Sequence, residues 1–405
     1  MHATTSSPEP PRLFPLMFAA LVGTMAMMAY VAVIGPVVRR LDLPEWVAGL
    51  SVTVGGVFWM LLARWWGRVS DRRGRKPVLM AGLGVFGLVY IVLAFGVDMA
   101  LQGYMGAIAV AGLLIVTRTL VGAFYAAVPP TAAATIADNT APHERGPAMA
   151  KLGTANALGM VAGPAAAGWL ATQSLSAAFY AAAALPLLGF LVIAFALPRQ
   201  APKAGGPGKP AGAGVRMSDP RLRQLCLTAF AAMFSVAVAQ VLVGFFAIDR
   251  LGLDAEEGAR VAGWALTAVG GALIVSQQFV MRLKNVPPQR WLWIGAFISG
   301  LGFGSVVLTA SQLQLLCSYG VAAFGMGMIF PTFQAMAANA VGPHEQGAAA
   351  GNLAAAQGLG MVIGPLAGTL LYRVMPSIPY LLVACMLIIL GLATALKRPA
   401  SAARS

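Results

Sequence analysis

The chain has 405 residues, of which 59% are hydrophobic and 10% are charged, and its mean hydropathy is +0.78. A soluble globular protein carries about 25% charged residues, so this composition excludes a water-soluble protein and predicts a polytopic membrane protein. The net charge of +14 does not indicate nucleic-acid binding, because the cations lie between apolar runs, where they act as topogenic signals.

Apolar runs of about 20 residues are long enough to cross a bilayer. The N-terminal segment, Met1–Pro11, has no basic stretch and no small-residue cleavage site, so we expect the first span itself to direct insertion. Twelve membrane-spanning helices are predicted, at Leu13–Val38, Trp46–Trp66, Val78–Val97, Tyr104–Pro129, Ala148–Thr172, Ala177–Leu197, Leu222–Ile248, Val261–Met281, Trp291–Ala310, Leu313–Ala338, Ala348–Tyr372 and Tyr380–Leu396.

The positive charges predict the orientation of these helices. Of the 27 lysines and arginines, 21 lie on the face that contains the Gly67–Pro77 loop, five lie on the other face, and Arg118 lies within a helix. Cytoplasmic loops carry the excess of lysine and arginine. We therefore expect both termini in the cytoplasm.

The chain divides into two related halves. Residues 198–220 begin with a flexible stretch rich in proline, glycine and lysine, so we predict a six-helix bundle at 1–197, a cytoplasmic linker at 198–220 and a second bundle at 221–405. Pro142–Gly146 recurs as Pro343–Gly347, and Gly159–Pro164 recurs as Gly360–Pro365, both with an offset of 201 residues. This register predicts a duplicated six-helix unit. Gly67–Pro77 has no copy at the same offset.

The Gly67–Pro77 loop combines two glycines, one carboxylate and five cations. Its spacing, Gly67-x-x-x-Asp71-Arg72-x-Gly74-Arg75-Lys76, resembles the loop signature of the major facilitator superfamily, between the second and third helices. With twelve spans, a central linker and a repeat, the resemblance covers the whole chain. It implies an all-α membrane protein with two pseudo-symmetric six-helix bundles.

The same resemblance implies that the loop has a role in gating. Asp71 would meet the start of the eleventh span near Gly347 and hold the halves closed on the cytoplasmic side, with Asp138 and Arg145 as further members of the charge network. The alternative is a set of positive-inside anchors with no conformational role. The residues that we assign to gating are Gly67, Asp71, Arg72, Gly74, Arg75, Lys76, Asp138, Arg145, Gly159, Gly163, Pro164 and Gly168.

Four of these gating residues belong to a motif in the fifth span, Gly159-x-x-x-Gly163-Pro164-x-x-Ala167-Gly168. Small residues at this spacing allow close helix packing, and proline kinks a helix. The motif resembles the one that marks drug:proton antiporters, the twelve-helix exporter group of the superfamily. Generic helix packing is the alternative, because the second half holds a near-copy.

Arg118 is the one ionisable side chain near the middle of a predicted span. Such a cation should face a cavity or a partner, where it binds an anionic or carbonyl-bearing substrate or is tied to neighbouring carbonyls. On helices that line the cavity in this family, further candidates form a largely apolar pocket. The predicted substrate-binding residues are Arg118, Tyr30, Phe124, Tyr125, Asn156, Gln240, Trp264, Gln334 and Gln357.

Several chemistries lack a sequence basis. The first span contains no carboxylate, and the nearest acids are at span ends, which leaves a proton-coupling carboxylate unassigned. No phosphate-binding Gly-x-x-x-x-Gly-Lys-Ser/Thr run, hydrolytic triad or metal-ligand spacing is present. We therefore predict no enzyme activity, no metal site and no cofactor.

The functional hypothesis is a secondary transporter that couples proton entry to the efflux of small amphipathic compounds or drugs by alternating access. Its partners are a small-molecule substrate, protons and the lipid bilayer, in a protein that we expect to be a monomer. Arg118 favours a second hypothesis, the export of an anionic metabolite or siderophore-like compound. A third, of another class, is a non-transporting membrane receptor or scaffold. Short outer loops indicate a bacterial inner (cytoplasmic) membrane.

Overall fold

The computed structural model describes residues 13–141, 144–198, 219–283, 286–342 and 345–396, and these ranges form helices joined by short turns. Most of the predicted linker, at 199–218, lies outside the described residues. The helices are α1 (Leu13–Arg40), α2 (Trp46–Arg73), α3 (Arg75–Leu101), α4 (Ala107–Tyr125), α5 (Val128–Asn139), α6 (Arg145–Ala171), α7 (Leu175–Ala196), α8 (Arg223–Leu251), α9 (Ala255–Arg282), α10 (Pro288–Val306), α11 (Gln312–Asn339), α12 (Gln346–Val374) and α13 (Ile378–Ala395).

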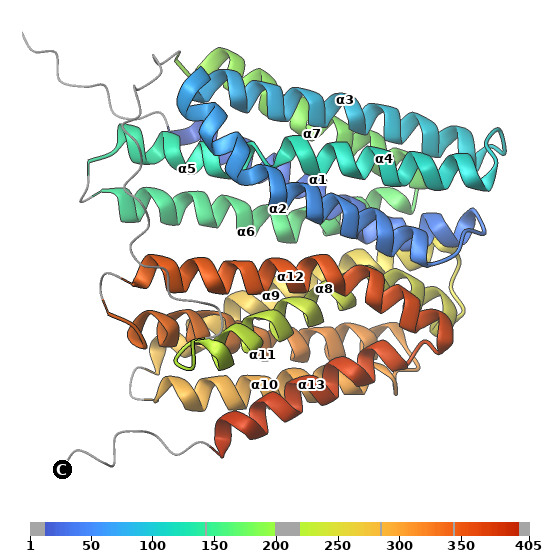
Figure 1. Cartoon of the computed structure of the whole chain (residues 1–405). Helices are drawn as coiled ribbons and strands as arrows, with labels where there is room; N and C mark the ends of the chain where they lie inside the picture. Colours follow the sequence, from blue (N-terminus) through green and yellow to red (C-terminus); the bar gives the residue numbers. More distant parts are fainter. Residues whose placement is uncertain (1–12, 142–143, 199–218, 284–285, 343–344, 397–405) are drawn as a thin grey trace, which may run out of the picture.

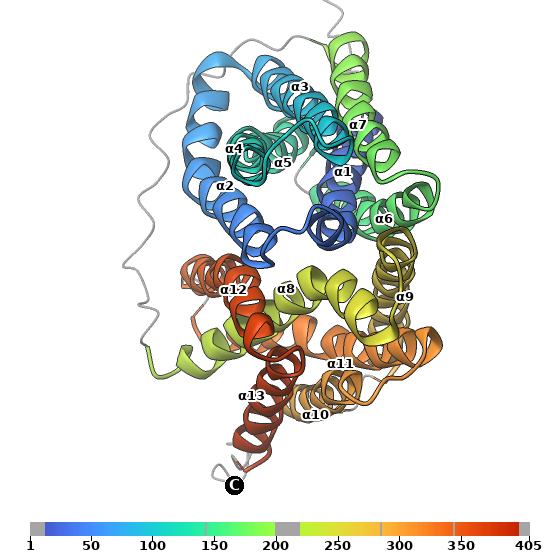
Figure 2. The same cartoon turned by 90° about the vertical axis from the view of Figure 1, so that its right-hand side faces the viewer.

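The helices form two bundles, which confirms the predicted fold class (Figure 1). The first half contains α1 to α7 and the second half α8 to α13; the two are packed side by side with their long axes roughly aligned (Figures 1 and 2). Ten stretches of the described chain are long and apolar enough to cross a membrane, with α4 and α5 counted together. The remaining two predicted spans correspond to α6 and α10, which are both rich in glycine.

The fourth predicted span is divided in two. The chain leaves the helix after Tyr125 and starts α5 at Val128, directly before Pro129 and Pro130. A proline has no N–H to donate and its ring clashes with the preceding turn, so it is tolerated at the start of a helix and not in its interior. In the second half, α11 carries the single Pro331 and stays continuous.

The two halves match with two different registers. Trp46 and Ala255, which begin α2 and α9, are 209 residues apart, whereas Arg145 and Gln346, which begin α6 and α12, are 201 apart. The difference of eight residues is a net change to which several segments contribute, the largest being the difference in length between α3, with 27 residues, and α10, with 19. The offset of 201 is therefore local, and the Gly67 loop corresponds to the end of α9.

Candidate functional site

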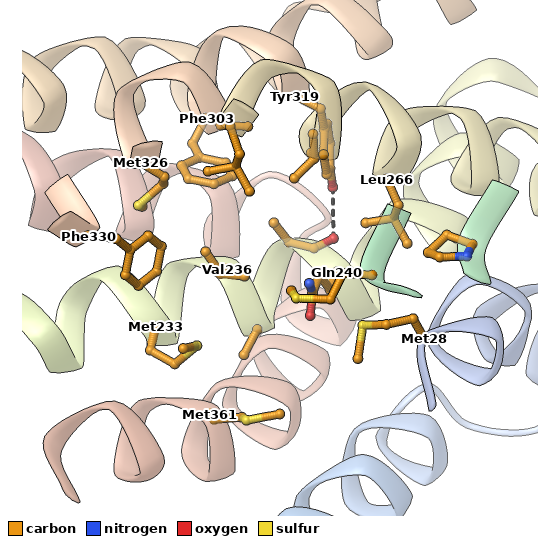
Figure 3. A pocket seen from close by; sticks show the side chains of 18 residues that line it. Met28, Met233, Val236, Gln240, Leu266, Phe303, Tyr319, Met326, Phe330 and Met361 are labelled. Carbon is orange, nitrogen blue, oxygen red and sulfur yellow. Dashed lines mark hydrogen bonds between the residues drawn. The ribbon is translucent and has the colours of Figure 1, made fainter. Parts of the chain in front are cut away.

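A central cavity of about 190 Å³ lies between the two halves. Its lining comes mostly from the second half, with Met28 of α1 and two positions of α6 on the opposite side (Figure 3). Five methionines line it: Met28, Met160, Met233, Met326 and Met361. Tyr319 also lines it, and its hydroxyl donates to the carbonyl oxygen of Ala239 at 2.9 Å. The cavity is thus apolar and surrounded by flexible side chains.

Gln240 supplies the main polar side chain of this cavity and also reaches a second one. A smaller lobe of about 50 Å³ shares Met28, Ala237, Gln240 and Met361 with the central cavity. Its other walls come from α1, α2, α4, α8 and α12, and include Gly55, Gly56, Trp59 and Arg118. The two lobes together give an apolar chamber with a polar corner.

Arg118 forms that polar corner and is only 2% exposed. Its Nη1 atom donates to the Tyr90 hydroxyl at 3.2 Å and lies 3.6 Å from the sulfur of Met27. The guanidinium carbon lies 4.2 Å from the centre of the Tyr30 ring, a cation–π distance. Its Nε atom is buried without a hydrogen-bond partner in the described structure.

The other polar side chains of the first half bond to one another. Thr24 donates to the Asn156 amide oxygen at 2.8 Å and lies 3.1 Å from the Tyr125 hydroxyl, so that hydroxyl donates to Thr24. Tyr30 bonds to Ser51 at 2.7 Å. Because unpaired polar groups are costly in a membrane interior, these pairs fix α1 to α2, α4 and α6.

The structure places two of the nine predicted substrate-binding residues, Arg118 and Gln240, in the walls of the two lobes. Phe124 packs against Trp66 with ring centres 5.6 Å apart, Trp264 is 55% exposed, and Gln334 is exposed. The seven that are absent from the walls of both lobes are Tyr30, Phe124, Tyr125, Asn156, Trp264, Gln334 and Gln357.

Sequence reasoning missed most of the cavity wall. Met233, Met326, Phe303 and Phe330 carry no polar signal, and apolar side chains in a membrane helix face lipid, core or cavity with equal ease. The 20 methionines of the chain were the one available signal, because methionine is common on adaptable binding surfaces.

The halves are tied together at the end of the molecule where α1 stops and α2 begins. Arg39 of α1 forms a two-point ion pair with Asp249 of α8 and also pairs with Glu45 at 2.7 Å. Tyr372 of α12 donates to the same Asp249 at 2.8 Å. We call Arg39, Glu45, Asp249 and Tyr372 the interbundle lock.

Close helix packing supports the interbundle lock. A Cβ atom on Gly263 of α9 would lie 2.6 Å from the Pro164 carbonyl oxygen, and one on Gly49 of α2 would lie 2.6 Å from the Pro365 carbonyl oxygen. The same relation therefore occurs twice, once on each side of the pseudo-symmetry axis. Thr53 adds a hydrogen bond of 2.7 Å to the Val362 carbonyl.

The remaining glycines of the fifth-span motif have two roles. Gly159 and Gly163 face the backbone of α1, where a Cβ atom would come within 2.6 Å of the Leu21 carbonyl oxygen and 2.5 Å of that of Met25. Gly168 faces Gly263 across the interface between the halves. The helix α6 thus packs against its own bundle at Gly159 and Gly163, and against the other bundle at Gly168.

The Gly67 loop forms a charge network within the first half. Arg75 pairs with Asp71 at 2.6 Å and donates to Asp138 at 3.0 Å, and Asp71 is 52% exposed. Gly74 joins α2 to α3 with φ of 92°, a conformation that favours glycine.

Four further gating candidates lie around this network. The Lys76 ammonium donates to the carbonyls of Ala194 and Leu197, both at 2.6 Å, and so caps α7. Arg145 donates to the Thr140 carbonyl at 3.2 Å. Arg72 is exposed, and a Cβ atom on Gly67 would meet nothing within 4 Å.

A second charge cluster lies at the starts of α8 and α12. Arg221 donates to Asp219 at 2.9 Å and to Glu345 at 3.0 Å. The hydrogen bonds from Arg221 lower the pKa of both carboxyl groups below their ordinary values of 3.8 and 4.5. Both groups are therefore ionised at neutral pH.

The sequence matches the family model described as Major Facilitator Superfamily over residues 16–313 and 225–405. It is 30% identical to the class G tetracycline resistance protein of Vibrio anguillarum over 86% of this chain and 87% of that one. It is 22% identical to multidrug resistance protein 2 of Bacillus subtilis (strain 168) over 85% and 84%. The fold resembles an inward-facing, unoccupied bacterial homologue of the human lysosomal transporter Spinster, with a TM-score of 0.76 and 15% identity over 96% and 98%.

Proposed function

Because this chain belongs to the Major Facilitator Superfamily and is a secondary active efflux transporter, we propose that it exports small amphipathic compounds in exchange for protons. The observation that carries the proposal is the apolar chamber between the halves. Two relatives are named for tetracycline and multidrug resistance, so tetracycline is the first compound to test.

The chamber suits cargo that varies in shape. Methionine has a flexible, polarizable side chain and fills irregular spaces, so a wall of five methionines can adapt to several ligands. Gln240 and Arg118, at the junction and in the smaller lobe, supply the few polar contacts that orient a ligand. This combination favours a molecule with an apolar body and one polar end.

The proposed cycle alternates between two closures. The interbundle lock closes one end, and the excess of positive charge on the opposite face supports its assignment as the outer end. This supports an inward-facing state with both termini in the cytoplasm. In the outward-facing state the lock opens, and Asp71 leaves Arg75 to meet the start of α12.

A second cargo class is favoured by one specific observation. Arg118 is a buried cation that lines the smaller lobe, and its Nε atom has no hydrogen-bond partner among the described residues. An anionic or carbonyl-bearing cargo would satisfy that atom, which supports the export of anionic metabolites as the alternative function.

Transport in proteoliposomes with an imposed pH gradient tests both proposals. Internal pH is recorded while tetracycline and a panel of cationic, neutral and anionic compounds is added to wild type, Arg118→Ala and Asp71→Asn. Asp42→Asn is the matched control, because Asp42 has a positive φ of 51°, which asparagine tolerates, and lies at the opposite end from Asp71.

If the protein is a proton-coupled antiporter, we expect a transported compound to trigger proton movement in the wild type. Both Arg118→Ala and Asp71→Asn are expected to lose this movement. A response to anions alone, lost in Arg118→Ala, would favour the second cargo class. No coupled flux with any compound would contradict antiport. Equal loss in Asp42→Asn would remove the assigned role of Asp71.

A further inference from the structure

The charge of Arg118 is poorly balanced by its surroundings. The side chain is 2% exposed and lies in α4, within a membrane span. Transfer of an ionised group into such a medium is costly unless the charge is paired and hydrogen-bonded. Arginine does not escape this cost by losing its proton, because the guanidinium stays protonated in proteins.

The side chains that contact this guanidinium in the described part of the chain are all uncharged. The Tyr90 hydroxyl accepts from Arg118 and donates its own proton to the Ala26 carbonyl at 3.0 Å. Ser51 donates to the Ala48 carbonyl at 2.8 Å, so the Tyr30 hydroxyl donates to Ser51. Both tyrosines are therefore neutral phenols.

No counter-charge comes from elsewhere in the described ranges. None of the carboxylates there forms an ion pair with Arg118, and its Nε atom has no partner. A cation in this position lacks the negative charge that would balance it.

The space beside Arg118 fits one small ligand. The lobe of about 50 Å³ exceeds the roughly 10–15 Å³ of such space that one water molecule needs, and it is much smaller than the central cavity of about 190 Å³. Two of its walls carry N–H donors that are suited to an anion, the guanidinium of Arg118 and the amide of Gln240. The lobe also adjoins the larger cavity, because Gln240 lines both.

We propose that this lobe binds one compact monovalent anion, which balances the charge of Arg118. Two sources supply the same chemistry: a free anion such as chloride or nitrate, or the carboxylate end of an amphipathic cargo whose body lies in the larger chamber. The first source is independent of the proposed function, whereas the second rests on it. Because the lobe holds one such group, the two sources compete.

Thermal unfolding of the purified full-length protein tests the site without transport. The melting temperature, Tm, is measured in sodium chloride, sodium nitrate and sodium gluconate at equal ionic strength. Chloride and nitrate fit the lobe and gluconate does not, so we expect Tm to be roughly 2–4 °C higher in the two small anions. Equal Tm values in all three salts would overturn the free-anion source.

Two matched variants at Met27 separate this lobe from anion binding at the protein surface. The Met27 sulfur lies 3.6 Å from Arg118, so Met27→Glu places a carboxylate beside the guanidinium, and Met27→Gln is its neutral equivalent. We expect Met27→Gln to keep the chloride effect and Met27→Glu to lose it. If Met27→Glu keeps the full effect, the anion binds elsewhere and the proposal fails.

Benzoate and its uncharged analogue benzamide test the cargo source in gluconate buffer. Benzoate is expected to raise Tm, by an amount that chloride reduces, while benzamide has no effect. If neither benzoate nor the small anions act on the wild type, the anion site is overturned. Efflux in proteoliposomes is measured separately, so a failure of the proposed function leaves the result for the free anion unaffected.

Discussion

At the scale of single residues, the buried tyrosines of the first half act as structural partners. The Tyr125 hydroxyl is held by Thr24, which in turn bonds to Asn156, and Tyr90 holds the α1 backbone at Ala26. A hydroxyl in such a chain has already given its proton to a protein acceptor, so it has no proton left to donate to a ligand. These residues stiffen the bundle against which the cavity is built.

The Arg221 cluster gives a pH prediction at the same scale. Because the folded-state pKa values of Asp219 and Glu345 are lowered, their stabilising effect is present above the unfolded values near 3.8 and 4.5 and is lost as pH falls through the folded values. We therefore expect Arg221→Gln to lower Tm slightly at pH 7, by a difference that narrows as pH falls below the unfolded values of 4.5 and 3.8.

The control for that prediction is Arg223→Gln, which removes a neighbouring exposed charge that has no ion pair among the described residues. Exposed ion pairs contribute little, so the difference at pH 7 is small. An unchanged gap between wild type and Arg221→Gln from pH 7 to pH 3 would contradict the assigned linkage.

The sequence predicted which polar residues lie inside the membrane. It did not predict whether each side chain points into the cavity or toward another helix. Tyr30 and Gln240 are both polar residues in apolar spans, yet one stacks on Arg118 while the other lines both lobes. Which side of a span faces its neighbours depends on the rotation of each helix. That rotation follows from contacts between helices distant in sequence, such as Thr24 with Asn156.

At the scale of helices, α6 is an element that packs closely against both bundles. Its Gly159 and Gly163 allow close approach to α1, and the Pro164 carbonyl and Gly168 meet Gly263 on the other bundle. A movement of one bundle against the other must therefore change the contact between α6 and Gly263, while the contact between α6 and α1 is kept.

Two substitutions in α6 test the first of these contacts. In Gly163→Ala the added methyl group would lie 2.5 Å from the Met25 carbonyl oxygen, and backbone must shift to accommodate it. We expect a loss of about 1–3 kcal/mol in stability, seen as a lower Tm. Gly153→Ala, on the same helix with nothing within 4 Å, should leave Tm unchanged or raise it. Equal effects of both changes would refute close packing at Gly163.

The repeat shows how far helix-level prediction reached. The twelve spans were located because hydropathy is a property of each segment alone. The sequence did not predict that α10 is eight residues shorter than α3, because the recurring motifs all lie after these two helices in their halves of the chain. A single sequence offset does not reveal that a helix differs in length between the two halves. The bounds of the helices do reveal it.

At the scale of the whole molecule, the interbundle lock is the feature that a transport cycle has to open. A short bifunctional maleimide reagent should link Arg39→Cys to Asp249→Cys, in a background in which Cys226, Cys317 and Cys385 are replaced by alanine. The side chains of Arg39 and Asp249 are in contact in this structure, and the three cysteines to be replaced are free thiols. We expect the cross-linked protein to lose transport, since its halves cannot part at that end.

The single variants treated with the same reagent control for modification alone. Retained transport in fully cross-linked protein would show that the cycle does not require this end to open. Loss of transport in the single variants would mean that the side chains themselves, rather than the link, are essential.

The unequal composition of the two bundles has a consequence for how cargo preference evolves. Polar pairs in the first half depend on one another, so most changes there disturb folding. Methionines and aromatics of the second half that line the chamber tolerate exchange for other apolar residues. New cargo preferences should therefore arise by mutations concentrated at positions such as Met233, Met326 and Phe330, and selection experiments with successive compounds should recover them there first.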